Sequence, residues 1–415
     1  MVENKSSIMY SVDDLCNDLY HELTEDILPF WTGRMSDSDG GFYGRMDGYG
    51  VLHKDAPRGA VLNARIIWTL ARAANVLQTP DLCAAAERAA SYFRQHFIDQ
   101  EYGGIFWSVD ANGTALETKK QYYALAFGIY AFAELYRING KRADLELAIS
   151  LFHCIEEHSK DSSAGGYIEA GKRDWGPVED MRLSGKDLNC AKTMNTHLHI
   201  LEGYTGLYRV WKDPLLALAI KELIHTFAEH IIMPDGHMGM FFDRQWKPCS
   251  SEVSFGHDIE ASWLLEEAAK VLGDQDLYTS TKDICKRLAT AAMAGWKAGA
   301  GMAYCHDNTS GTKDEERHWW VQAETIVGCF VMCRTALKEQ RNEDAMYWLQ
   351  CSNDTWHFIR EHLICPDGEW YWSVNTHNGQ TLPNLKEDRA GLWKCPYHNG
   401  RMCLEIIEKT KIYND

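Results

Sequence analysis

Asp39-Gly-Gly-Phe-Tyr-Gly44 is the first of six similar segments that organise the chain. Each segment has glycines together with aromatic or alternating apolar residues, and the other five are Tyr102-Gly-Gly-Ile-Phe-Trp107, Ala164-Gly-Gly-Tyr-Ile168, Asp235-Gly-His-Met-Gly-Met240, Gly299-Ala-Gly-Met-Ala-Tyr304 and Asp367-Gly-Glu-Trp-Tyr-Trp372. Their first residues are separated by 63, 62, 71, 64 and 68 residues. A period of this length indicates one supersecondary unit per repeat. We interpret each segment as a tight turn that leads into a short strand.

Two helical stretches of different character separate one segment from the next. Residues 214–231 carry an apolar stripe opposite charged residues, which is typical of a surface helix, and Asp213-Pro214 supplies a cap followed by proline at its start. Residues 123–136 and 319–333 are apolar nearly all round, as expected for buried helices. We therefore predict about twelve helices that alternate between amphipathic and buried. The buried ones are predicted at residues 58–77, 118–138, 189–211, 255–272, 318–337 and 395–411.

Six outer and six inner helices that close on themselves form an (α/α)6 barrel. This is the fold that we predict: all-α, with six helical hairpins and short β-segments in the connecting turns. The length of 415 residues would on average suggest two or three domains, but closed barrels are often longer, so we expect a single catalytic domain over residues 1–415. The alternative is an open helical solenoid with the same repeat. The closed barrel is favoured over the open solenoid because a barrel accommodates six repeats and a centre with many residues that can do chemistry.

The composition excludes several classes of protein. The chain has 42 Lys and Arg against 59 Asp and Glu, a formal net charge of −17, which argues against binding to a nucleic-acid backbone. Its start lacks a basic segment followed by an apolar one, and no apolar run reaches the length of a membrane span. Thirteen cysteines without CxxC pairs indicate reduced thiols. We expect a soluble, cytoplasmic protein.

Residues that can do chemistry gather near the start of each buried helix. If these helices run parallel around a barrel, their N-termini converge on one mouth, and this convergence is the main sign of a site. The candidates are Arg65, Tyr123, Asn195, His197, His199, His257, Glu260, Trp319, Trp320, Glu324, His398 and Asn399.

The spacing of some candidates restricts their roles. His197 and His199 lie two residues apart and would point to different helix faces, so they are not expected to share a metal ion. His257 and Glu260 lie three apart, so the carboxylate could orient the imidazole, although an ordinary helical pair has the same spacing. Arg65 lies in an apolar run and should meet an anion, a carboxylate or a ligand oxygen. A structural salt bridge to an inner-helix glutamate is the alternative.

Other motifs set limits on the chemistry. Trp319 and Trp320 are adjacent and face different ways, so we expect one to line a pocket while the other packs. The sequence has no GxGxxG after a strand, no Walker A loop, no HExxH and no Gly-x-Ser-x-Gly. Nucleotide binding and serine-hydrolase chemistry therefore have no support.

A mouth with several histidines suits a proton-transfer reaction. A helix N-terminus disfavours the imidazolium and keeps histidine available as a neutral base near pH 7. Two such bases can remove a proton from one face of a carbon acid and return it on the other, while an arginine stabilises the enolate or enediolate oxygen. This pattern fits epimerisation next to a carbonyl better than hydrolysis, which needs two carboxylates. No metal, nucleotide or redox cofactor is required.

Four blocks of the sequence resemble the signature blocks of the cellobiose 2-epimerases, within the N-acylglucosamine 2-epimerase superfamily of α/α six-barrels. The blocks are Lys192-Thr-Met-Asn-Thr-His-Leu-His199, Ser254-Phe-Gly-His-Asp-Ile-Glu260, Trp319-Trp-Val-Gln-Ala-Glu324 and Lys394-Cys-Pro-Tyr-His-Asn-Gly-Arg401. Together with Arg65 and Lys120-Gln-Tyr-Tyr123 they span most of the chain in family order. Taken jointly, these blocks are specific to that family.

The resemblance implies reversible epimerisation at C2 of the reducing-end sugar of β-1,4-linked disaccharides such as cellobiose and lactose. It implies that His257 and His398 are the acid/base pair. His199 would assist opening of the pyranose ring, because only the open aldehyde makes the C2 proton acidic. Arg65 would hold the enediolate oxygens.

The resemblance also implies the surroundings of these residues. Asn195 and Glu260 would support the catalytic groups. The residues implied for sugar binding are Tyr123, Asp187, Trp319, Trp320, Trp393 and Glu324, with Tyr122 as the alternative to Tyr123. We expect no cofactor and no metal, a small disaccharide as the partner, no nucleic acid or membrane, and a monomer or weak homo-oligomer.

Other functions fit parts of the pattern. An aldose–ketose isomerase on the same barrel would return the proton to C1. An N-acylglucosamine epimerase with a nucleotide activator is less favoured, because of the tandem tryptophans and the block 394–401. An inverting glycosidase would use Asp187, Glu260 or Glu324, and a non-catalytic sugar-binding or protein-interaction module would use none of these groups.

Overall fold

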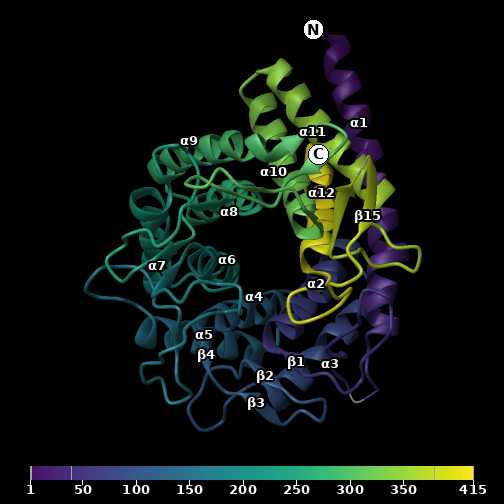
Figure 1. Cartoon of the computed structure of the whole chain (residues 1–415). Helices are drawn as coiled ribbons and strands as arrows, with labels where there is room; N and C mark the ends of the chain where they lie inside the picture. The colour runs from purple at the N-terminus through teal and green to yellow at the C-terminus, as the bar shows by residue number, and fades with distance from the viewer. Residues whose placement is uncertain (1, 39, 378, 415) are drawn as a thin grey trace.

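Two concentric rings of helices make up most of the computed structural model, which describes residues 2–38, 40–377 and 379–414 (Figure 1). The inner helices are α2 (Ala60–Leu77), α4 (Tyr122–Asn139), α6 (Met194–Val210), α8 (Phe255–Leu272), α10 (Trp319–Lys338) and α12 (Tyr397–Asn414). The outer helices are α1 (Val2–His21), α3 (Pro80–His96), α5 (Arg142–His158), α7 (Pro214–Thr226), α9 (Gln275–Ala292) and α11 (Asn342–His362).

The inner ring is closed. Each inner helix packs against the next one, and α12 contacts both α10 and α2. The prediction of an (α/α)6 barrel is therefore confirmed, and the open solenoid is wrong. No helix in the described part of the chain is long and apolar enough to cross a membrane.

The distribution of apolar residues explains which helices lie inside. In α4 every residue from Tyr122 to Leu135 is buried, whereas α7 buries one stripe of apolar side chains. The predicted start of α7 is confirmed, because the Asp213 carboxylate accepts the N–H groups of Leu215 and Leu216. The predicted end at Ile231 is reached by a π-helical turn, η3 (Phe227–Ile231), which continues α7.

Short strands determine where most inner helices begin. Five strands end directly before an inner helix: β1 (Arg58–Gly59), β4 (Lys120–Gln121), β6 (Lys192–Thr193), β8 (Glu252–Ser254) and β13 (Arg317–His318). Five of the helices begin later than predicted: α2, α4, α6 and α10, because these residues are extended rather than helical, and α12, which begins at Tyr397 instead of residue 395. The helix α8 begins at the predicted residue 255.

Each of these strands pairs with a strand from the following repeat. The partners are β2 (Ser108–Val109), β5 (Ala170–Gly171), β7 (Phe241–Phe242), β11 (Cys305–Asp307) and β14 (Ser373–His377). Every partner follows one of the glycine and aromatic segments, so the predicted turn into a short strand is confirmed for five segments. In the first segment Asp39 lies outside the described residues, and Ser36 and Phe42 form an antiparallel bridge.

The remaining elements extend these pairs or the ends of the outer helices. The added strands are β3 (Ala115–Glu117) on β2, β12 (Lys313–Asp314) on β11, β15 (Gln380–Pro383) on β14, and the pair β9 (Trp296–Lys297) and β10 (Gly301–Met302). The short helical turns are η1 (Glu22–Ile27), η2 (Phe30–Arg34) and η4 (Met293–Gly295). The strand pairs hold the N-termini of the inner helices at one end of the barrel.

Candidate active site

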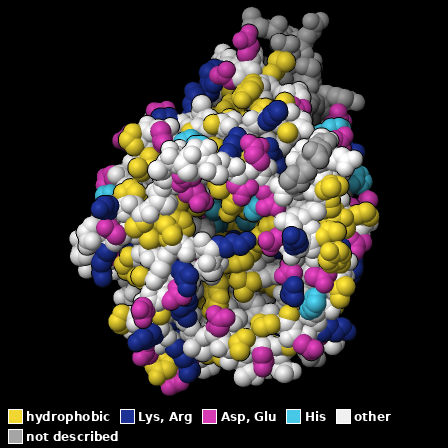
Figure 2. All heavy atoms as spheres, viewed as in Figure 1, with side chains coloured by type: hydrophobic (Ala, Val, Ile, Leu, Met, Phe, Trp, Pro, Cys, Tyr) yellow, Lys and Arg dark blue, Asp and Glu magenta, His cyan; other side chains and the backbone are white. Residues whose placement is uncertain are grey.

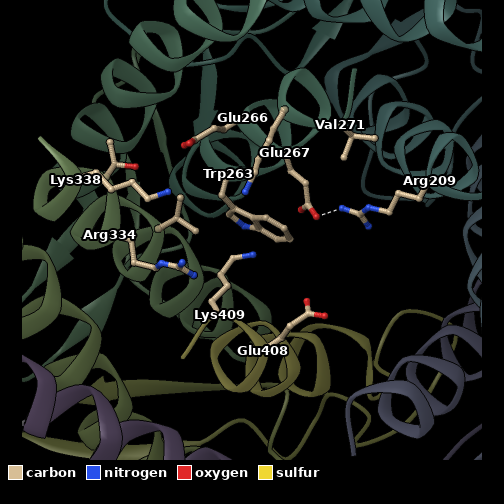
Figure 3. Close-up of a pocket in the computed structure, with 12 residues that line it drawn as sticks. Arg209, Trp263, Glu266, Glu267, Val271, Arg334, Lys338, Glu408 and Lys409 are labelled. Atoms are coloured by element: carbon tan, nitrogen blue, oxygen red, sulfur yellow. Dashed lines mark hydrogen bonds and ion pairs between the residues drawn. The ribbon is translucent and has the colours of Figure 1, made fainter. Parts of the chain in front are cut away.

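A cavity of about 530 Å³ opens at the end of the barrel where the inner helices begin. Figure 2 shows it as a hollow near the middle of the face in view, with histidine side chains visible inside. The helix residues that line it are Arg65, Tyr123, Asn195, His199, His257, Glu260, Trp319, Trp320 and His398. A second cavity, at the other end of the barrel (Figure 3), is lined by none of the predicted site residues. The predicted convergence of helix N-termini therefore identifies the first cavity as the candidate active site.

Three residues near the predicted site lie outside this cavity. His197 is fully buried, with Nδ1 2.7 Å from the Thr193 carbonyl oxygen and Nε2 accepting the N–H of Tyr167 at 2.9 Å. Asn399 donates to a buried carboxylate of the barrel wall. The Tyr122 hydroxyl donates to a backbone carbonyl, so Tyr123 is the tyrosine that reaches the cavity.

The buried His197 leads to a prediction about stability. Burial lowers the pKa of His197 to about 4, whereas a histidine in the unfolded chain titrates near 6.5. Between these values only the unfolded chain binds the proton, so His197 lowers the free energy of unfolding by up to about 1.4 kcal/mol per pH unit as pH falls. His197→Gln should remove this dependence. Urea unfolding of both proteins at pH 7 and pH 5 measures the difference, and parallel pH dependences would contradict the assignment.

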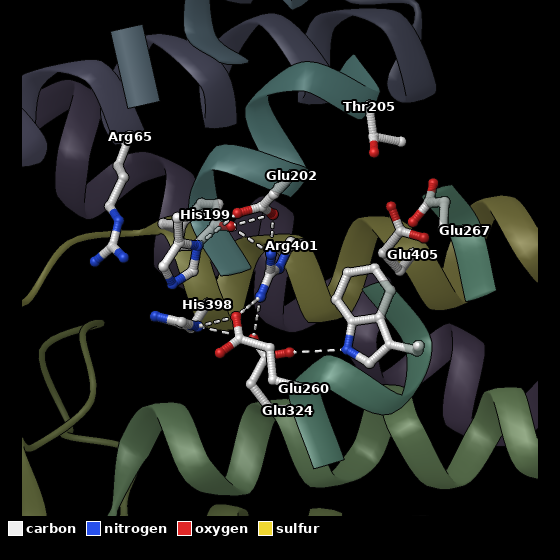
Figure 4. A network of polar contacts seen from close by, with 12 residues as sticks. Arg65, His199, Glu202, Thr205, Glu260, Glu267, Glu324, His398, Arg401 and Glu405 are labelled. Atoms are coloured by element: carbon white, nitrogen blue, oxygen red, sulfur yellow. Dashed lines mark hydrogen bonds and ion pairs between the residues drawn. The ribbon is translucent and has the colours of Figure 1, made fainter. Parts of the chain in front are cut away.

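His398, in the first turn of α12, is held by Glu324 from α10 (Figure 4). Nδ1 of His398 lies 2.7 Å from Oε1 of Glu324, and that carboxylate also accepts from Arg401 at 2.6 Å and from Trp263 at 3.1 Å. An acceptor carboxylate requires Nδ1 to donate, so the other ring nitrogen keeps its lone pair, and it points to the side where Arg65 lies (Figure 4). Burial, followed by the charges of the two arginines, lowers the pKa of His398 well below its ordinary value. His398 is therefore a neutral base near pH 7.

Glu324 acts behind the cavity rather than in it. The resemblance placed it among the sugar-binding residues, but it does not line the cavity and is fully buried, so that expectation is wrong. The ligand atoms of Glu260, Glu324 and His398 lie within 4.8 Å of one another, close enough to share a metal ion. Nη2 of Arg401 donates to both carboxylates, so the cation that lies against them here is a guanidinium.

His257, in the first turn of α8, is held by Ser254. Nδ1 of His257 lies 2.8 Å from Oγ of Ser254, and the same oxygen accepts the backbone N–H of His257 at 3.4 Å as the helix cap. Of the two possibilities left open for His257 and Glu260, orientation of the ring by this carboxylate is not observed, because Glu260 accepts from Arg401 instead. Burial is the largest cause that lowers the pKa of His257 to about 3. A second neutral imidazole therefore faces the cavity.

Removal of the Ser254 hydroxyl should slow catalysis more than it weakens substrate binding. Ser254→Ala frees the His257 ring, and we expect kcat to fall about tenfold, part of the 10²–10⁴-fold that proton transfer contributes, with KM nearly unchanged. Ser254→Thr keeps a hydroxyl at this position and serves as the matched control. Steady-state kinetics of both variants test the prediction, and equal kcat values for them would show that the hydroxyl does not position the ring.

The third cavity histidine, His199, is held from behind by Glu202. Nδ1 of His199 lies 2.8 Å from the Glu202 carboxylate. Burial alone would raise the pKa of Glu202, but the Arg401 guanidinium and His199 hold it near 2. Arg401 is fully buried and donates to Glu202, Glu260 and Glu324. It is thus the cation that allows several carboxylates to be buried around the histidines.

The Arg65 guanidinium reaches the cavity without a carboxylate partner. Nη2 of Arg65 donates to the Tyr123 hydroxyl at 2.8 Å, and the guanidinium carbon lies 4.2 Å from the ring centre of Phe127 and 4.6 Å from that of Tyr397. Among the described residues no carboxylate oxygen lies within 4.0 Å of its nitrogens. The structural salt bridge considered as the alternative is therefore not formed. The charge of Arg65 is available to a ligand oxygen.

Trp319 and Trp320 both line the cavity, so the pair is not divided into one lining and one packing residue, and both are placed where the resemblance implies. The ring centre of Trp320 lies 4.7 Å from that of His257 and 5.6 Å from that of His398. The ring of Trp319 lies 4.5 Å from that of Trp372, another residue of the cavity wall. Flat apolar faces thus lie directly beside the two imidazoles.

Several polar atoms of the cavity wall are free to accept hydrogen bonds. Oδ1 of Asn195 and Oε2 of Glu260 are buried without a hydrogen-bond partner in the described residues. Burial, followed by the charge of Glu324, raises the pKa of Glu260 to about 7. Asp187 and Trp393 reach the same cavity from loops. Acceptors beside aromatic faces are what a polyhydroxylated ring requires.

Comparison with known proteins agrees with this geometry. Residues 41–398 match the N-acylglucosamine 2-epimerase (GlcNAc 2-epimerase) family. The chain is 46% identical to a cellobiose 2-epimerase of Bacteroides fragilis over 95% of its length and 98% of that protein, and 35% identical to one of Ruminococcus albus over 95% and 99%. The solved structure of cellobiose 2-epimerase from Bacillus thermoamylovorans superposes with a TM-score of 0.88 at 36% identity, covering 96% of this chain and 100% of that one.

The fold and the site define an enzyme of the sugar epimerase class, built on a closed helical barrel. The chain belongs to the N-acylglucosamine 2-epimerase family. Its general reaction is epimerisation at C2 of a sugar.

Proposed function

We propose that this enzyme reversibly epimerises C2 of the reducing-end glucose or mannose of β-1,4-linked disaccharides, converting cellobiose to glucosylmannose and lactose to epilactose. The observation that carries the proposal is one cavity in which two neutral histidines, His257 and His398, accompany an arginine, Arg65, that forms no ion pair within 4.0 Å among the described residues. The names of the similar proteins support the choice of sugar.

Ring opening is the first step, because only the open aldehyde acidifies the proton on C2. His199 assists it: Nδ1 donates to the Glu202 carboxylate, and the other ring nitrogen can take the proton of the anomeric hydroxyl and return it to the ring oxygen as the bond between C1 and that oxygen breaks. Glu202 is ionised, so it also stabilises the imidazolium that results.

The proton on C2 is then removed by one histidine of the pair and returned to the opposite face by the other. The returning histidine must carry a proton, although burial favours the neutral form of both rings. Solvent in the open cavity can supply this proton at the ring nitrogen that faces the substrate, because Nδ1 of His398 is held by Glu324 and Nδ1 of His257 by Ser254. When the two histidines exchange their acid and base roles, the reverse epimerisation results.

The negative charge that develops between the two steps is stabilised by Arg65. The enediolate oxygens lie on C1 and C2, and a guanidinium with several donors and no carboxylate partner can bind both of them. Tyr123, which accepts from Arg65, fixes its orientation.

The wall of the cavity favours a substrate with two rings. The cavity of about 530 Å³ is lined by the three histidines of the proposed reaction, by the rings of Trp319, Trp320 and Trp393, and by the loop that carries Asp187. One ring can be processed at the histidines while the second lies against an indole. A glycosidase is less well supported, because Glu324 is buried behind His398 and bound to Arg401.

Incubation with cellobiose, lactose, N-acetylglucosamine and mannose, followed by NMR of the anomeric protons, tests the proposal. We expect a mannose-type reducing end from cellobiose and lactose, with a constant number of reducing ends and without added cofactor. A fructose-ended product would indicate the aldose–ketose isomerase, and new reducing ends would indicate a glycosidase. Conversion of the monosaccharides alone would contradict the proposed substrate.

A further inference from the structure

The second cavity has a volume of about 420 Å³ and lies among the last turns of α6, α8, α10 and α12 (Figure 3). It is at the far end of the barrel from the histidines and shares no lining residue with the catalytic cavity. Its size falls within the range of small-molecule sites. None of the steps proposed above uses it.

Cations predominate in the wall of this far-end cavity. The five that line it are Arg209, Lys270, Arg334, Lys338 and Lys409, against three carboxylates. This surplus is local, since the whole chain carries a formal net charge of −17. A pocket with a local surplus of one charge concentrates ligands of the opposite charge.

Two of these cations have no carboxylate of their own. Arg209 pairs with Glu267, and Lys409 lies 2.5 Å from the Glu405 carboxylate. Lys270 and Lys338 form no ion pair within 4.0 Å in the described part of the chain. Burial and the neighbouring Arg334 and Lys270 charges lower the pKa of Lys338, as expected where cations face one another across a cavity.

The rest of the wall is suited to a neutral ring. The indole of Trp263 forms part of it and is fixed there, because its N–H donates to Glu324 and the Arg401 guanidinium lies 4.7 Å from the ring centre. Glu266 also lines the cavity, and its carboxylate, of which one oxygen accepts from the Tyr278 hydroxyl at 3.0 Å, can accept further hydroxyl protons. A simple anion would contact the cations alone and would leave the face of Trp263 and the second oxygen of Glu266 without a ligand contact.

We propose that the far-end cavity binds a phosphorylated monosaccharide, with the phosphate between Lys270, Arg334 and Lys338 and the sugar ring against Trp263. The phosphate takes charge-assisted hydrogen bonds from the unpaired ammonium groups. The hydroxyls of the ring donate to the carboxylate of Glu266. This proposal does not rest on the proposed epimerisation, because binding of the phosphorylated sugar is measured without turnover.

Cations at the C-terminal end of a helix also complement the helix dipole, and Lys270 and Lys338 lie in the last turns of α8 and α10. If this were their whole role, their removal would change the stability of the protein and no ligand would bind. Binding and stability must therefore be measured separately.

Isothermal titration calorimetry of the full chain with glucose 6-phosphate at low salt is the direct test, with glucose and inorganic phosphate as the comparison ligands. We expect one saturable site, at least about tenfold tighter for glucose 6-phosphate than for either comparison ligand, and unaffected by saturating cellobiose. No saturable binding up to about 10 mM would overturn the proposal. So would displacement by cellobiose, which assigns the binding to the catalytic cavity, or equal affinity for inorganic phosphate, which leaves an anion site without a sugar.

Substitutions assign the binding to the cavity. The double change Lys270→Gln with Lys338→Gln should weaken glucose 6-phosphate binding at least about tenfold, while Lys286→Gln, which removes one positive charge from an exposed position of α9, should not. Thermal melting establishes that each variant is folded. Undiminished binding by the folded double variant would overturn the proposed site.

Discussion

His398→Asn abolishes epimerisation and leaves the protein folded, if the two-base scheme is correct. Both directions of the reaction use both histidines, so the loss should reach the upper end of the 10²–10⁴-fold that general acid or base catalysis contributes. The fold should persist because Glu324, the partner of His398, remains bound to Arg401 and Trp263. Turnover of cellobiose by NMR and thermal melting measure the two effects. Turnover near that of the unchanged enzyme would contradict the scheme.

The residual chemistry of this variant separates a catalytic from a structural role. The remaining base, His257, can still exchange the C2 proton of one epimer with solvent, although it cannot invert the carbon. We therefore expect His398→Asn to incorporate deuterium into only one of the two epimers. His230→Asn, which changes an exposed histidine stacked on Trp246 outside the cavity, is the matched control and should keep its full rate.

Arg65→Ala lowers the rate by at least about 10²–10³-fold, the loss typical of one oxyanion donor. The expected effect is on the chemical step, because the guanidinium binds the enediolate more strongly than the neutral sugar. Stability should change little: Arg65 neutralises no carboxylate, so its removal leaves no buried charge unpaired. A fall of tenfold or less in kcat/KM would show that Arg65 has a structural role.

A second readout reports on the electrostatics of the site. The charge of Arg65 is among the causes that lower the pKa of His257 and of His398, after burial. Arg65→Ala should therefore raise the pKa of both rings, which NMR titration of the histidine resonances detects. Unchanged titration would mean that the guanidinium lies too far from the imidazoles to act on the same substrate atoms.

The fold could be predicted from the sequence because its signals are periodic. The six glycine and aromatic segments gave the number of repeats, and the apolar character of stretches such as 123–136 separated inner from outer helices. The starts of α2, α4 and α6 were predicted too early, because the residues before each helix are extended by strand pairing with the next repeat. That pairing depends on residues about 50 positions away, which no local pattern contains.

Only the residues that line the active-site cavity could be predicted from the sequence. The blocks of the sequence contain His199, His257 and His398, and these side chains meet in one cavity. Of the groups behind them, Glu324 was named with a sugar-binding role, and the roles of Glu202 and Arg401 were missed. Glu202 and Arg401 each lie three residues after a cavity histidine, a spacing that indicates a shared helix face but not which carboxylate faces which ring. The pairing of His398 with Glu324 joins two helices and depends on distances that only the folded barrel fixes.

The location of deuterium after the first turnovers in D₂O tests the central claim most directly. Cellobiose is incubated with the enzyme for much less than one conversion, and both epimers are examined by NMR. Two histidines on opposite faces predict deuterium at C2 of nearly all the glucosylmannose formed, while the remaining cellobiose keeps its C2 proton. Product that retains protium at C2, or deuterium that appears at C1 of a ketose, would contradict the account.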